Sequence, residues 1–315
     1  MRLDVIVPTY NRQELLARTL DSLLAARVPS GLEAHTTVVD NNSKDATRSL
    51  VESYMERFGG RLHYVFESSA QGRSVSLNAG IRATSESGGE LVGMIDDDEE
   101  VDVAWYETAF RAFTEDARTA FVGGPCKPRW GARQPAWLPM DYLGVIGWIE
   151  CGERVLTYGE DHPGMLMGGN VCIRREVLER VGLYRTALGR TDKKMLSGED
   201  QDMFERLMAA GARGLYLPEL VIYHYVPAER LTKSYFRRWC FWNSVSLGVL
   251  DRERRAPVVY LGGVPRWMYR NAARGLVTAT KAGLGRNGDA SRAFSEELDV
   301  WKLAGFFYGK HFYRA

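Results

Sequence analysis

The sequence predicts an α/β fold, in which a mostly parallel sheet carries helices on both faces. Two observations support this fold class. Short apolar, β-branched runs alternate with segments of helical periodicity through the first half of the 315-residue chain, as in right-handed β-α-β units. Three of the apolar runs also end directly in polar clusters, and open sheets of this kind bind ligands at the carboxyl ends of their strands. We therefore expect the functional residues to converge at that edge of the sheet.

The first-half elements follow from local patterns, taken in chain order. The first apolar run ends at Pro8, and Asn11 with Glu14 three residues later indicates a capping box at the start of a helix. Turn-prone residues end the second run, and the fourth run leads straight into acidic residues. The expected strands span residues 3–7, 36–39, 63–66, 91–95 and 121–122, and the expected helices begin at residue 11 and cover residues 46–58 and 75–83.

The second half changes character after residue 125. Pro, Gly, Trp and Arg recur in residues 125–139, which predicts an irregular loop. From residue 231 onward the chain is aromatic, basic and largely helical in pattern, and we expect it to form an appendage to the sheet. The expected elements between the two are strands at residues 171–173 and 221–225 and helices at residues 175–181 and 197–210.

Composition indicates the class of protein and the cellular compartment in which it is expected. Hydrophobic residues make up 45% and charged residues 26% of the chain, as in soluble globular proteins. No stretch approaches the ~20 apolar residues that span a bilayer, and the first residues lack the apolar region and cleavage site of an export signal. The four cysteines lie far apart without a CxxC pair, which favours free thiols in a reducing compartment. We therefore expect a cytoplasmic protein.

Charge is distributed unevenly along the chain. Residues 1–225 hold 25 Lys and Arg against 33 Asp and Glu, whereas the rest of the chain holds 16 against 7. A helix predicted at residues 265–279 carries Arg266, Arg270 and Arg274 beside aromatic and apolar residues, as helices on a membrane surface do. A basic segment docked on the protein itself, with its arginines in water, explains the same pattern. Both interpretations stay open, and no nucleic-acid partner is expected.

An acidic run, Asp-Asp-Asp-Glu-Glu, ends the fourth predicted strand. Because side chains alternate along a strand, Asp96 and Asp98 face the same side, where two carboxylates can bind a divalent cation. Mg²⁺ or Mn²⁺ held there would neutralise the charge that grows on a nucleotide diphosphate as its bond to a sugar breaks. A solvated turn is the alternative, although such a turn does not require an apolar strand before it. We expect Asp97, Glu99 and Glu100 to face solvent.

Asp40 and Arg73 are two further candidates, and each has an alternative role. Asp40 ends the second predicted strand and can accept hydrogen bonds from a base or ribose, while an Asx-turn or a helix cap explains it almost as well. Arg73 follows a glycine that permits close approach of the backbone, so a phosphate or carboxylate partner suits it. The alternative for Arg73 is an exposed arginine at the start of a helix.

Two later segments supply a candidate base and a candidate metal ligand. Glu199 and Asp200 belong to the segment Ser197-Gly198-Glu199-Asp200 at a predicted helix start, where the helix dipole stabilises carboxylates. Asp200 can also act there as a general base that removes the proton from an acceptor hydroxyl, and the two roles are compatible. His224 lies in a strand-like run and is either a metal ligand or a structural histidine.

Together these motifs resemble the family 2 glycosyltransferases of the GT-A fold. Any one of the motifs is weak, but four in the family's order and approximate spacing are specific, and they cover roughly residues 3–225. The resemblance implies a GT-A, Rossmann-like sheet with a helical C-terminal appendage. The segments that carry it are Val-Ile-Val-Pro-Thr-Tyr-Asn-Arg at residues 5–12, Val-Val-Asp-Asn-Asn-Ser at 38–43, Met-Ile-Asp-Asp-Asp-Glu at 94–99 and Gly-Glu-Asp at 198–200.

The resemblance also implies roles for individual residues. The expected nucleotide-sugar-binding residues are Pro8, Thr9, Tyr10, Asn11, Asp40, Arg73, Asp96 and Asp97. The expected metal ligands are Asp98, Asp96 and His224, and the expected catalytic residues are Asp200 as the base and Glu199 beside it near the acceptor. We accordingly expect residues 1–125 to bind the nucleotide sugar, residues 126–225 to bind the acceptor within the same GT-A domain, and residues 226–315 to form a basic helical region.

These roles predict a metal-dependent, inverting glycosyltransferase of the bacterial, non-processive type. It would move one sugar from a nucleotide-diphosphate sugar to the hydroxyl of a saccharide, lipid-linked or other acceptor, in the biosynthesis of cell-envelope polysaccharide, glycolipid or another glycoconjugate. Processive family members carry a Gln-x-x-Arg-Trp motif and transmembrane helices, whereas this chain has Tyr235 in place of the Gln before Arg238-Trp239. We expect a cytoplasmic enzyme with peripheral contact to the inner face of the membrane through its basic C-terminal region.

Two rival functions share part of this pattern. A sugar nucleotidyltransferase would also carry aspartates at a strand end, but it would favour a glycine-rich phosphate loop after the first strand, which Pro-Thr-Tyr-Asn is not. A non-catalytic nucleotide-sugar-binding protein could keep the fold without the Glu199-Asp200 pair. The presence of that pair favours an enzyme.

Overall fold

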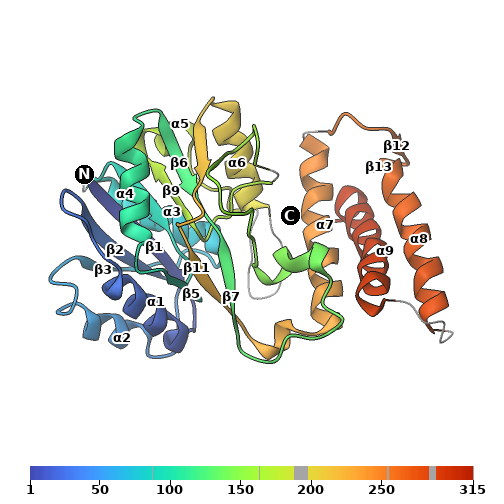
Figure 1. Cartoon of the computed structure of the whole chain (residues 1–315), viewed down its shortest axis with the longest axis horizontal. Helices are drawn as coiled ribbons and strands as arrows, with labels where there is room; N and C mark the ends of the chain where they lie inside the picture. The colour runs from blue at the N-terminus through green and yellow to red at the C-terminus, as the bar shows by residue number, and fades with distance from the viewer. Residues whose placement is uncertain (87, 163, 188–197, 254, 284–288, 315) are drawn as a thin grey trace. The chain divides into compact units, whose positions relative to one another are not determined.

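A computed structural model of the chain describes residues 1–86, 88–162, 164–187, 198–253, 255–283 and 289–314. The chain forms two compact units. Unit 1 contains the predicted sheet and its helices, and unit 2 contains the C-terminal helices (Figure 1). Unit 1 consists of residues 1–127, 149–186 and 199–225, and unit 2 of residues 128–148, 187–198 and 226–315. The assignment of donor binding to residues 1–125 and of acceptor binding to residues 126–225 stays a prediction.

The main sheet of unit 1 is mostly parallel, as predicted. Strands β1, β2, β3 and β4 run parallel to one another, and β6 runs parallel to β10, whereas β9 is antiparallel to both β4 and β6. The short β8 is antiparallel to β10. In sheet order the strands are β3 (Leu62–Phe66), β2 (Glu33–Asp40), β1 (Arg2–Thr9), β4 (Leu91–Met94), β9 (Val171–Arg174), β6 (Thr119–Gly123), β10 (Arg213–Tyr216) and β8 (Leu156–Thr157).

Helices cover both faces of this sheet. Because neighbouring side chains of a strand point to opposite faces, Val5 and Val7 of β1 belong to one apolar cluster and Ile6 between them belongs to the other. The strands are buried on both sides, which explains why they read as continuous apolar runs. The first cluster includes α1 (Gln13–Ala25), α2 (Thr47–Tyr54) and α4 (Trp105–Glu115), and the second includes α3 (Arg73–Ser85), α5 (Arg175–Val181) and α6 (Glu199–Ala209).

A small second sheet lies beside the acidic run. Its strands are β5 (Glu99–Val101), β11 (Ile222–Val226) and β7 (Cys126–Trp130), in that order. β11 is antiparallel to β5 and pairs His224 with Glu99. This pairing brings a histidine that is more than a hundred residues away in the sequence next to the end of β4.

The capping box predicted at the start of α1 is wrong. The residue that caps α1 is Arg12, and its side chain accepts no hydrogen bond from the first turn. Asn11 instead adopts a left-handed backbone with φ 51°, and its Oδ1 accepts a hydrogen bond from Lys44 N at 2.6 Å. The side chain is therefore used to join the ends of β1 and β2 rather than to cap the helix.

The other predicted elements of unit 1 are confirmed within a few residues at each end, and the ones that were missed are short or lie between motifs. Strands β5, β7, β8 and β10 have two to five residues, which is too short for a clear alternation. Helix α4 was also missed, although Trp105, Ala109 and Phe113 recur in it at helical spacing and are buried. Residues 126–130, which were expected to be irregular, form β7.

The described residues of unit 2 form three long helices, as its helical pattern predicted. Helix α9 (Ala290–His311) packs against both α7 (Lys233–Glu253) and α8 (Arg266–Gly283), and a hairpin of β12 (Tyr260–Leu261) and β13 (Val264–Pro265) precedes α8. Two short 3-10 helices, η1 (Met140–Ile146) and η2 (Ala228–Arg230), belong to the same unit. The helices approach closely at glycines, since a Cβ on Gly305 would lie 2.1 Å from Phe241 O.

Two predictions about the whole chain were made from its composition. All four cysteines are free thiols, as the sequence predicted. None of the helices in the described parts of the chain has both the length and the apolar composition needed to cross a bilayer.

Candidate functional site

The polar clusters that follow β1, β2 and β4 meet at the carboxyl edge of the main sheet. Thr9 and Asp40 are register partners at the ends of β1 and β2, and Asn41 N donates a hydrogen bond to Thr9 O at 2.9 Å. Thr9 Oγ1 donates to Asp97 Oδ2 at 2.8 Å across the edge to the acidic run. The predicted convergence of the three clusters is therefore present in unit 1.

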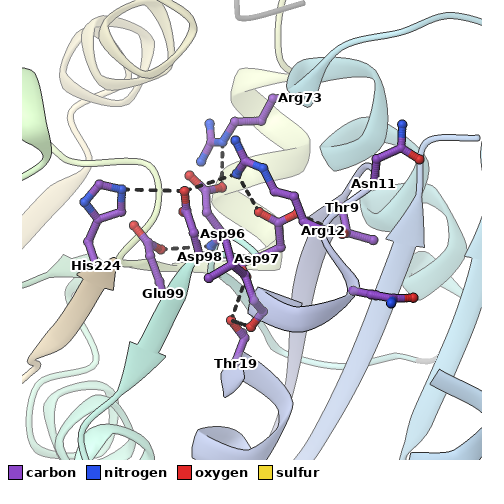
Figure 2. A network of polar contacts seen from close by, with 12 residues as sticks. Thr9, Asn11, Arg12, Thr19, Arg73, Asp96, Asp97, Asp98, Glu99 and His224 are labelled. Atoms are coloured by element: carbon purple, nitrogen blue, oxygen red, sulfur yellow. Dashed lines mark hydrogen bonds and ion pairs between the residues drawn. The ribbon is translucent and has the colours of Figure 1, made fainter. Parts of the chain in front are cut away.

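Arg12 compensates the charge of two of the three aspartates. Its guanidinium donates to Asp97 Oδ1 at 2.9 Å and to Asp98 Oδ2 at 3.1 Å, as Figure 2 shows. Both carboxylates are buried, with 4% and 8% of their residue surface exposed. Arg12 belongs to the first motif but was not predicted as a site residue, and its position directly after the strand-ending motif was the signal available in the sequence.

The expectation that Asp97 and Glu99 face solvent is wrong. Asp97 accepts the Thr9 hydroxyl, and its backbone carbonyl accepts Thr19 Oγ1 at 3.0 Å. Burial raises the pKa of Asp97 to about 6, with Arg12 opposing and Asp98 adding to the rise. Glu99 Oε2 accepts a hydrogen bond from Asp96 N at 2.8 Å, and burial together with Asp96 and Asp98 raises the pKa of Glu99 well above its usual value.

These two residues are buried because β4 and β5 leave almost no exposed turn between them. The hydrogen bonds of Asp97 and Glu99 hold the acidic run in a fixed shape against α1 and the end of β4. Glu100 is partly exposed, and Asp96 keeps 29% of its side chain exposed. Of the five acidic residues, Asp96 is thus better placed to meet a ligand than either Asp97 or Glu99.

Arg73 joins the acidic run to the candidate base. Its Nε donates to Asp96 Oδ1 at 2.7 Å, and one terminal nitrogen donates to Asp200 Oδ1 at 3.0 Å and lies 3.7 Å from Glu199 Oε1. Only 15% of the side chain is exposed, so the alternative of an exposed arginine at a helix start is wrong. Its other terminal nitrogen is buried and has no hydrogen-bond partner in the described parts of the chain.

Asp200 and Glu199 occupy the first positions of α6, at the positive end of the helix dipole. Asp200 keeps 27% of its side chain exposed, whereas Glu199 keeps 7%. Of the two carboxylates, Asp200 is therefore the one that an acceptor hydroxyl can reach. Ser197, which was predicted to open this helix, lies outside the described residues.

Two glycines that sequence reasoning did not assign to the site shape it. A Cβ on Gly168 would lie 1.9 Å from Asp200 Oδ1, and a Cβ on Gly169 would lie 2.4 Å from Glu99 Oε1. The backbone before β9 therefore passes directly against both carboxylates, which only glycine permits. The Gly-Gly pair before a predicted strand was the available signal.

His224 lies beside Asp98. Its Nε2 is 3.7 Å from Asp98 Oδ2 (Figure 2), and 7% of the residue surface is exposed. In the described part of the chain no three His, Cys, Asp or Glu side chains gather as metal ligands. The same Asp98 oxygen already receives the positive charge of Arg12, so a cation and Arg12 would compete for it.

The donor set at this point fits a hard divalent cation. Carboxylate oxygens and an imidazole nitrogen are ligands of Mn²⁺, and carboxylate oxygens are ligands of Mg²⁺. Asp98 and His224 face each other across a ligand-to-ligand distance of 3.7 Å. Phosphate oxygens of a substrate would supply the remaining ligands, as is usual for Mg²⁺ bound with nucleotides.

The residues expected to bind the nucleoside have local partners as well. Asp40 Oδ1 accepts Ser43 N, three residues on, at 2.8 Å, a local bond although not an Asx-turn, and Oδ2 accepts the Tyr64 hydroxyl at 2.7 Å. Pro8 and Thr9 are buried, Tyr10 is partly exposed and Asn11 is exposed. Thr9 acts on the site through Asp97, because its hydroxyl donates to that carboxylate.

Asn41 is a further residue that the sequence did not single out. Its Nδ2 donates to Glu67 O and Ala70 O at 3.1 and 2.8 Å, and its Oδ1 accepts Gly72 N at 2.8 Å. These bonds fix the turn that leads into α3. The position of Arg73 at the start of α3 therefore depends on a residue at the end of β2.

Comparisons with known proteins show the family to which the chain is related. Residues 4–182 match the family described as Glycosyl transferase family 2. The chain is 27% identical over 254 residues to a glucosyl-dolichyl phosphate glucuronosyltransferase from Haloferax volcanii, covering 80% of this chain and 78% of that protein. Over 85 residues it is 45% identical to a validoxylamine A glucosyltransferase from Streptomyces hygroscopicus subsp. jinggangensis, covering 26% of this chain and 19% of that protein.

A solved structure gives the same picture of the fold. The chain is similar to the mannosyltransferase PcManGT from Pyrobaculum calidifontis, solved in complex with GDP-Man and Mn²⁺. The TM-score is 0.65 at 20% sequence identity, and the match covers 98% of this chain and 86% of that chain. At this level of identity the likeness establishes the GT-A fold.

Proposed function

Because the chain belongs to glycosyltransferase family 2 and is therefore a glycosyltransferase that uses a nucleotide-sugar donor, we propose that it transfers one sugar with inversion, assisted by a divalent cation. The observation that best supports this proposal is the Arg73 bridge. One guanidinium contacts Asp96, at the donor end of the site, and Asp200, the candidate base. In this proposal, a carboxylate on the donor side and the base therefore both contact the same arginine side chain.

The cation proposed here is Mn²⁺ or Mg²⁺, held by Asp98 and His224 with Asp96 beside them. When bound, it neutralises charge on the diphosphate of the donor. The proposal is supported by the facing positions of Asp98 and His224 and by the Mn²⁺ bound with GDP-Man in the similar mannosyltransferase. In the chain without a cation, Arg12 supplies positive charge to the same carboxylate oxygen.

The chemical step proposed for Asp200 is a single displacement. Asp200 accepts the proton of the acceptor hydroxyl as that oxygen forms a bond to the anomeric carbon. The bond from the anomeric carbon to the diphosphate oxygen breaks on the opposite side, and its electron pair leaves with the nucleoside diphosphate. One attack from the opposite side inverts the anomeric centre. Arg73 orients Asp200 for this step through their contact at 3.0 Å.

The donor is held, in this proposal, by residues at the ends of β1 and β2. Pro8, Thr9, Tyr10, Asn11 and Asp40 would line the nucleoside side of the site, because they lie on the same edge as the acidic run. Tyr10 and Asn11 are the members with exposed surface. Asp97 would act indirectly, since its carboxylate is already bound by Thr9 and Arg12, whereas the unpartnered nitrogen of Arg73 is a donor for phosphate or sugar oxygens.

We further propose that the acceptor is a saccharide or a lipid-linked saccharide used in building a cell-envelope polysaccharide or another glycoconjugate. The name of the Haloferax volcanii relative, which specifies a dolichyl phosphate-linked glucose, supports a lipid-linked acceptor. Work at such an acceptor would take place at the inner face of the membrane, which agrees with the predicted peripheral contact of the C-terminal region. Asp200 and Glu199 would face this acceptor.

A panel of nucleotide sugars tests the proposed reaction. The purified chain is incubated with each donor and Mn²⁺, and release of nucleoside diphosphate is measured with and without simple acceptors. The wild-type chain should release nucleoside diphosphate from one donor in preference to the rest. Asp200→Asn should lower the rate about 10²- to 10⁴-fold, as expected for loss of a general base, while donor affinity stays within a few-fold of wild type.

The matched control is Glu205→Gln, the same kind of change on the same helix at a residue that bonds Gln201 rather than Arg73. It should turn over like the wild type. Release by Asp200→Asn at the wild-type rate would remove Asp200 from the role of base. Binding of a donor without any release by the wild type would favour the rival function of a nucleotide-sugar-binding protein, and formation of a new nucleotide sugar would favour a nucleotidyltransferase.

A further inference from the structure

Exposed apolar side chains gather at one end of unit 2. Val259 and Leu261 of the β12–β13 hairpin are 69% and 60% exposed, and Phe312 just after α9 is 62% exposed. Val258 beside the hairpin and two aromatic residues of α9, Phe307 and Tyr308, are 40–42% exposed. Large apolar residues are normally scattered singly over a protein surface. We call these six residues the hairpin patch.

Contacts within unit 2 show that the hairpin patch is continuous. His311 Nε2 lies 2.9 Å from Gly262 O, so the turn of the hairpin is bonded to the last turn of α9. The Phe307 ring lies 4.8 Å from the His311 ring and 5.8 Å from the Phe312 ring, and Phe312 stacks on Tyr308. The hairpin therefore lies next to the end of α9, as the ribbon in Figure 1 shows.

Basic residues border this patch. Arg266 follows the hairpin, and its backbone N donates to Val259 O at 2.8 Å. Arg255 lies over the Tyr260 ring at 4.0 Å. The side chains of Arg266 and Arg270 are exposed and make no hydrogen bond or ion pair with any residue the structure describes.

One apolar side of α8 is packed against the protein. Met268 and Ala272 are 4% and 3% exposed, and a Cβ on Gly275 would lie 2.1 Å from Glu296 O of α9. The helix therefore packs on the protein with its arginines in water, which was one of the two interpretations of its sequence. Trp267, Leu276 and Val277 of α8 are 46%, 57% and 55% exposed, and the hairpin patch is a second and larger group of exposed apolar residues.

We propose that the hairpin patch docks on an anionic lipid bilayer. Its valine, leucine and aromatic side chains would enter the interfacial layer, while Arg255, Arg266 and Arg270 meet lipid phosphates. An anionic bilayer complements the positive charge of these arginines, whereas a second copy of this chain does not. A two-fold contact through the same patch would bring the arginines of both copies into one interface.

This inference concerns the surface that would bring the proposed site to a lipid-linked acceptor, and it stands apart from the chemistry proposed for Asp200. The test is co-sedimentation of the full chain with vesicles of phosphatidylcholine alone or mixed with phosphatidylglycerol. The wild type should partition onto the mixed vesicles in preference to the neutral ones. Added salt should weaken that preference, because screening reduces the attraction between arginines and phosphates.

Two double variants and a control separate the contributions. Leu261→Ser with Phe312→Ser should lower partitioning onto the mixed vesicles by roughly tenfold or more, because both side chains belong to the apolar surface. Arg266→Glu with Arg270→Glu should remove the preference for anionic vesicles. Val103→Ser, at a residue of unit 1 that is 47% exposed, should bind like the wild type. All of these side chains are exposed, so thermal unfolding should stay near that of the wild type.

Equal partitioning of the wild type onto neutral and anionic vesicles would overturn the proposal, as would a hairpin-patch variant that still binds like the wild type. A dimer that forms without lipid and disappears in the Leu261→Ser, Phe312→Ser variant would instead assign the patch to a second copy. Release of nucleoside diphosphate in solution should be unchanged in the patch variants. Absence of that release from the wild type, with its vesicle binding intact, would count against the reaction proposed for Asp200 and not against the membrane surface.

Discussion

The arginines of the candidate site and those of the unit 2 surface carry the same charge in opposite settings. Arg12 and Arg73 each contact two or more carboxylates, and 15% of the Arg73 side chain is exposed. Arg266 and Arg270 lie on the surface of α8 and have no ion-pair partner in the described chain. In the site the arginines are bound to carboxylates of the same unit, whereas the arginines on α8 are available to a binding partner.

Because of this difference, we expect replacing an arginine to lower stability strongly in the site and only slightly on α8. An arginine that compensates buried carboxylates cannot be removed without leaving those charges unpaired, which is costly. An exposed arginine without partners contributes little to stability, because water already solvates it. The folding of unit 1 is therefore expected to depend on its candidate site, while the surface of unit 2 should tolerate substitution in the absence of a membrane.

The largest effect is expected from Arg73→Met. The change removes the guanidinium group that Asp96, Asp200 and the nearly buried Glu199 share. It should lower the free energy of unfolding by about 3 kcal/mol. This is the lower end of the usual range because Asp96 and Asp200 are partly exposed. Arg270→Met is the matched control and should stay within about 0.5 kcal/mol of wild type. Denaturant unfolding measures both, and equal effects of the two substitutions would contradict the comparison.

Asp98→Asn is expected to weaken cation-dependent binding. Replacing the carboxylate removes a charged ligand of Mn²⁺ or Mg²⁺, so the affinity for a nucleoside diphosphate with Mn²⁺ should fall by about tenfold or more. Without metal, after treatment with a chelator, variant and wild type should bind alike. Calorimetric titration provides both values, and Glu107→Gln, at a side chain that is 50% exposed, is the control. Unchanged affinity of the variant in the presence of Mn²⁺ would remove Asp98 from the metal site.

A smaller change in stability is expected from Gly168→Ala. The added methyl group would meet the Asp200 carboxylate, and overpacking of this kind costs about 1–3 kcal/mol. Because Asp200 must move to relieve the contact, turnover should fall by more than the loss of stability explains. Gly144→Ala is the control, since a Cβ there has no neighbour within 4 Å. A Gly168→Ala variant with wild-type turnover would show that the position of Asp200 is not critical.

Much of the fold was predictable because its signals are local. The strands before Pro8, Asp40 and Asp96 are short apolar runs that end in polar motifs, and their order alone indicates a parallel sheet. The convergence of those motifs followed from the rule that parallel strands present their carboxyl ends at one edge. The capping box failed because the tertiary contact of Asn11 with Lys44 N replaced a local hydrogen bond.

The parts of the site that escaped prediction depend on contacts between distant segments. Arg73 was as well explained by an exposed helix start, because nothing in the sequence placed Asp200, 127 residues later, beside it. The burial of Asp97 and Glu99 depends on how tightly β5 follows β4, and the sequence of the acidic run alone favours an exposed turn. Gly168 acquires its role only when α6 brings Asp200 against it.

The central claim is a single displacement in which Asp200 is the base. The most direct test is the anomeric configuration of the first-formed product, followed by proton NMR with the donor that the nucleotide-sugar panel identifies. The account predicts that the new glycosidic bond has the configuration opposite to that of the sugar in the donor. A product that retains the donor's configuration would contradict it, because retention requires a mechanism other than one direct attack from the opposite side.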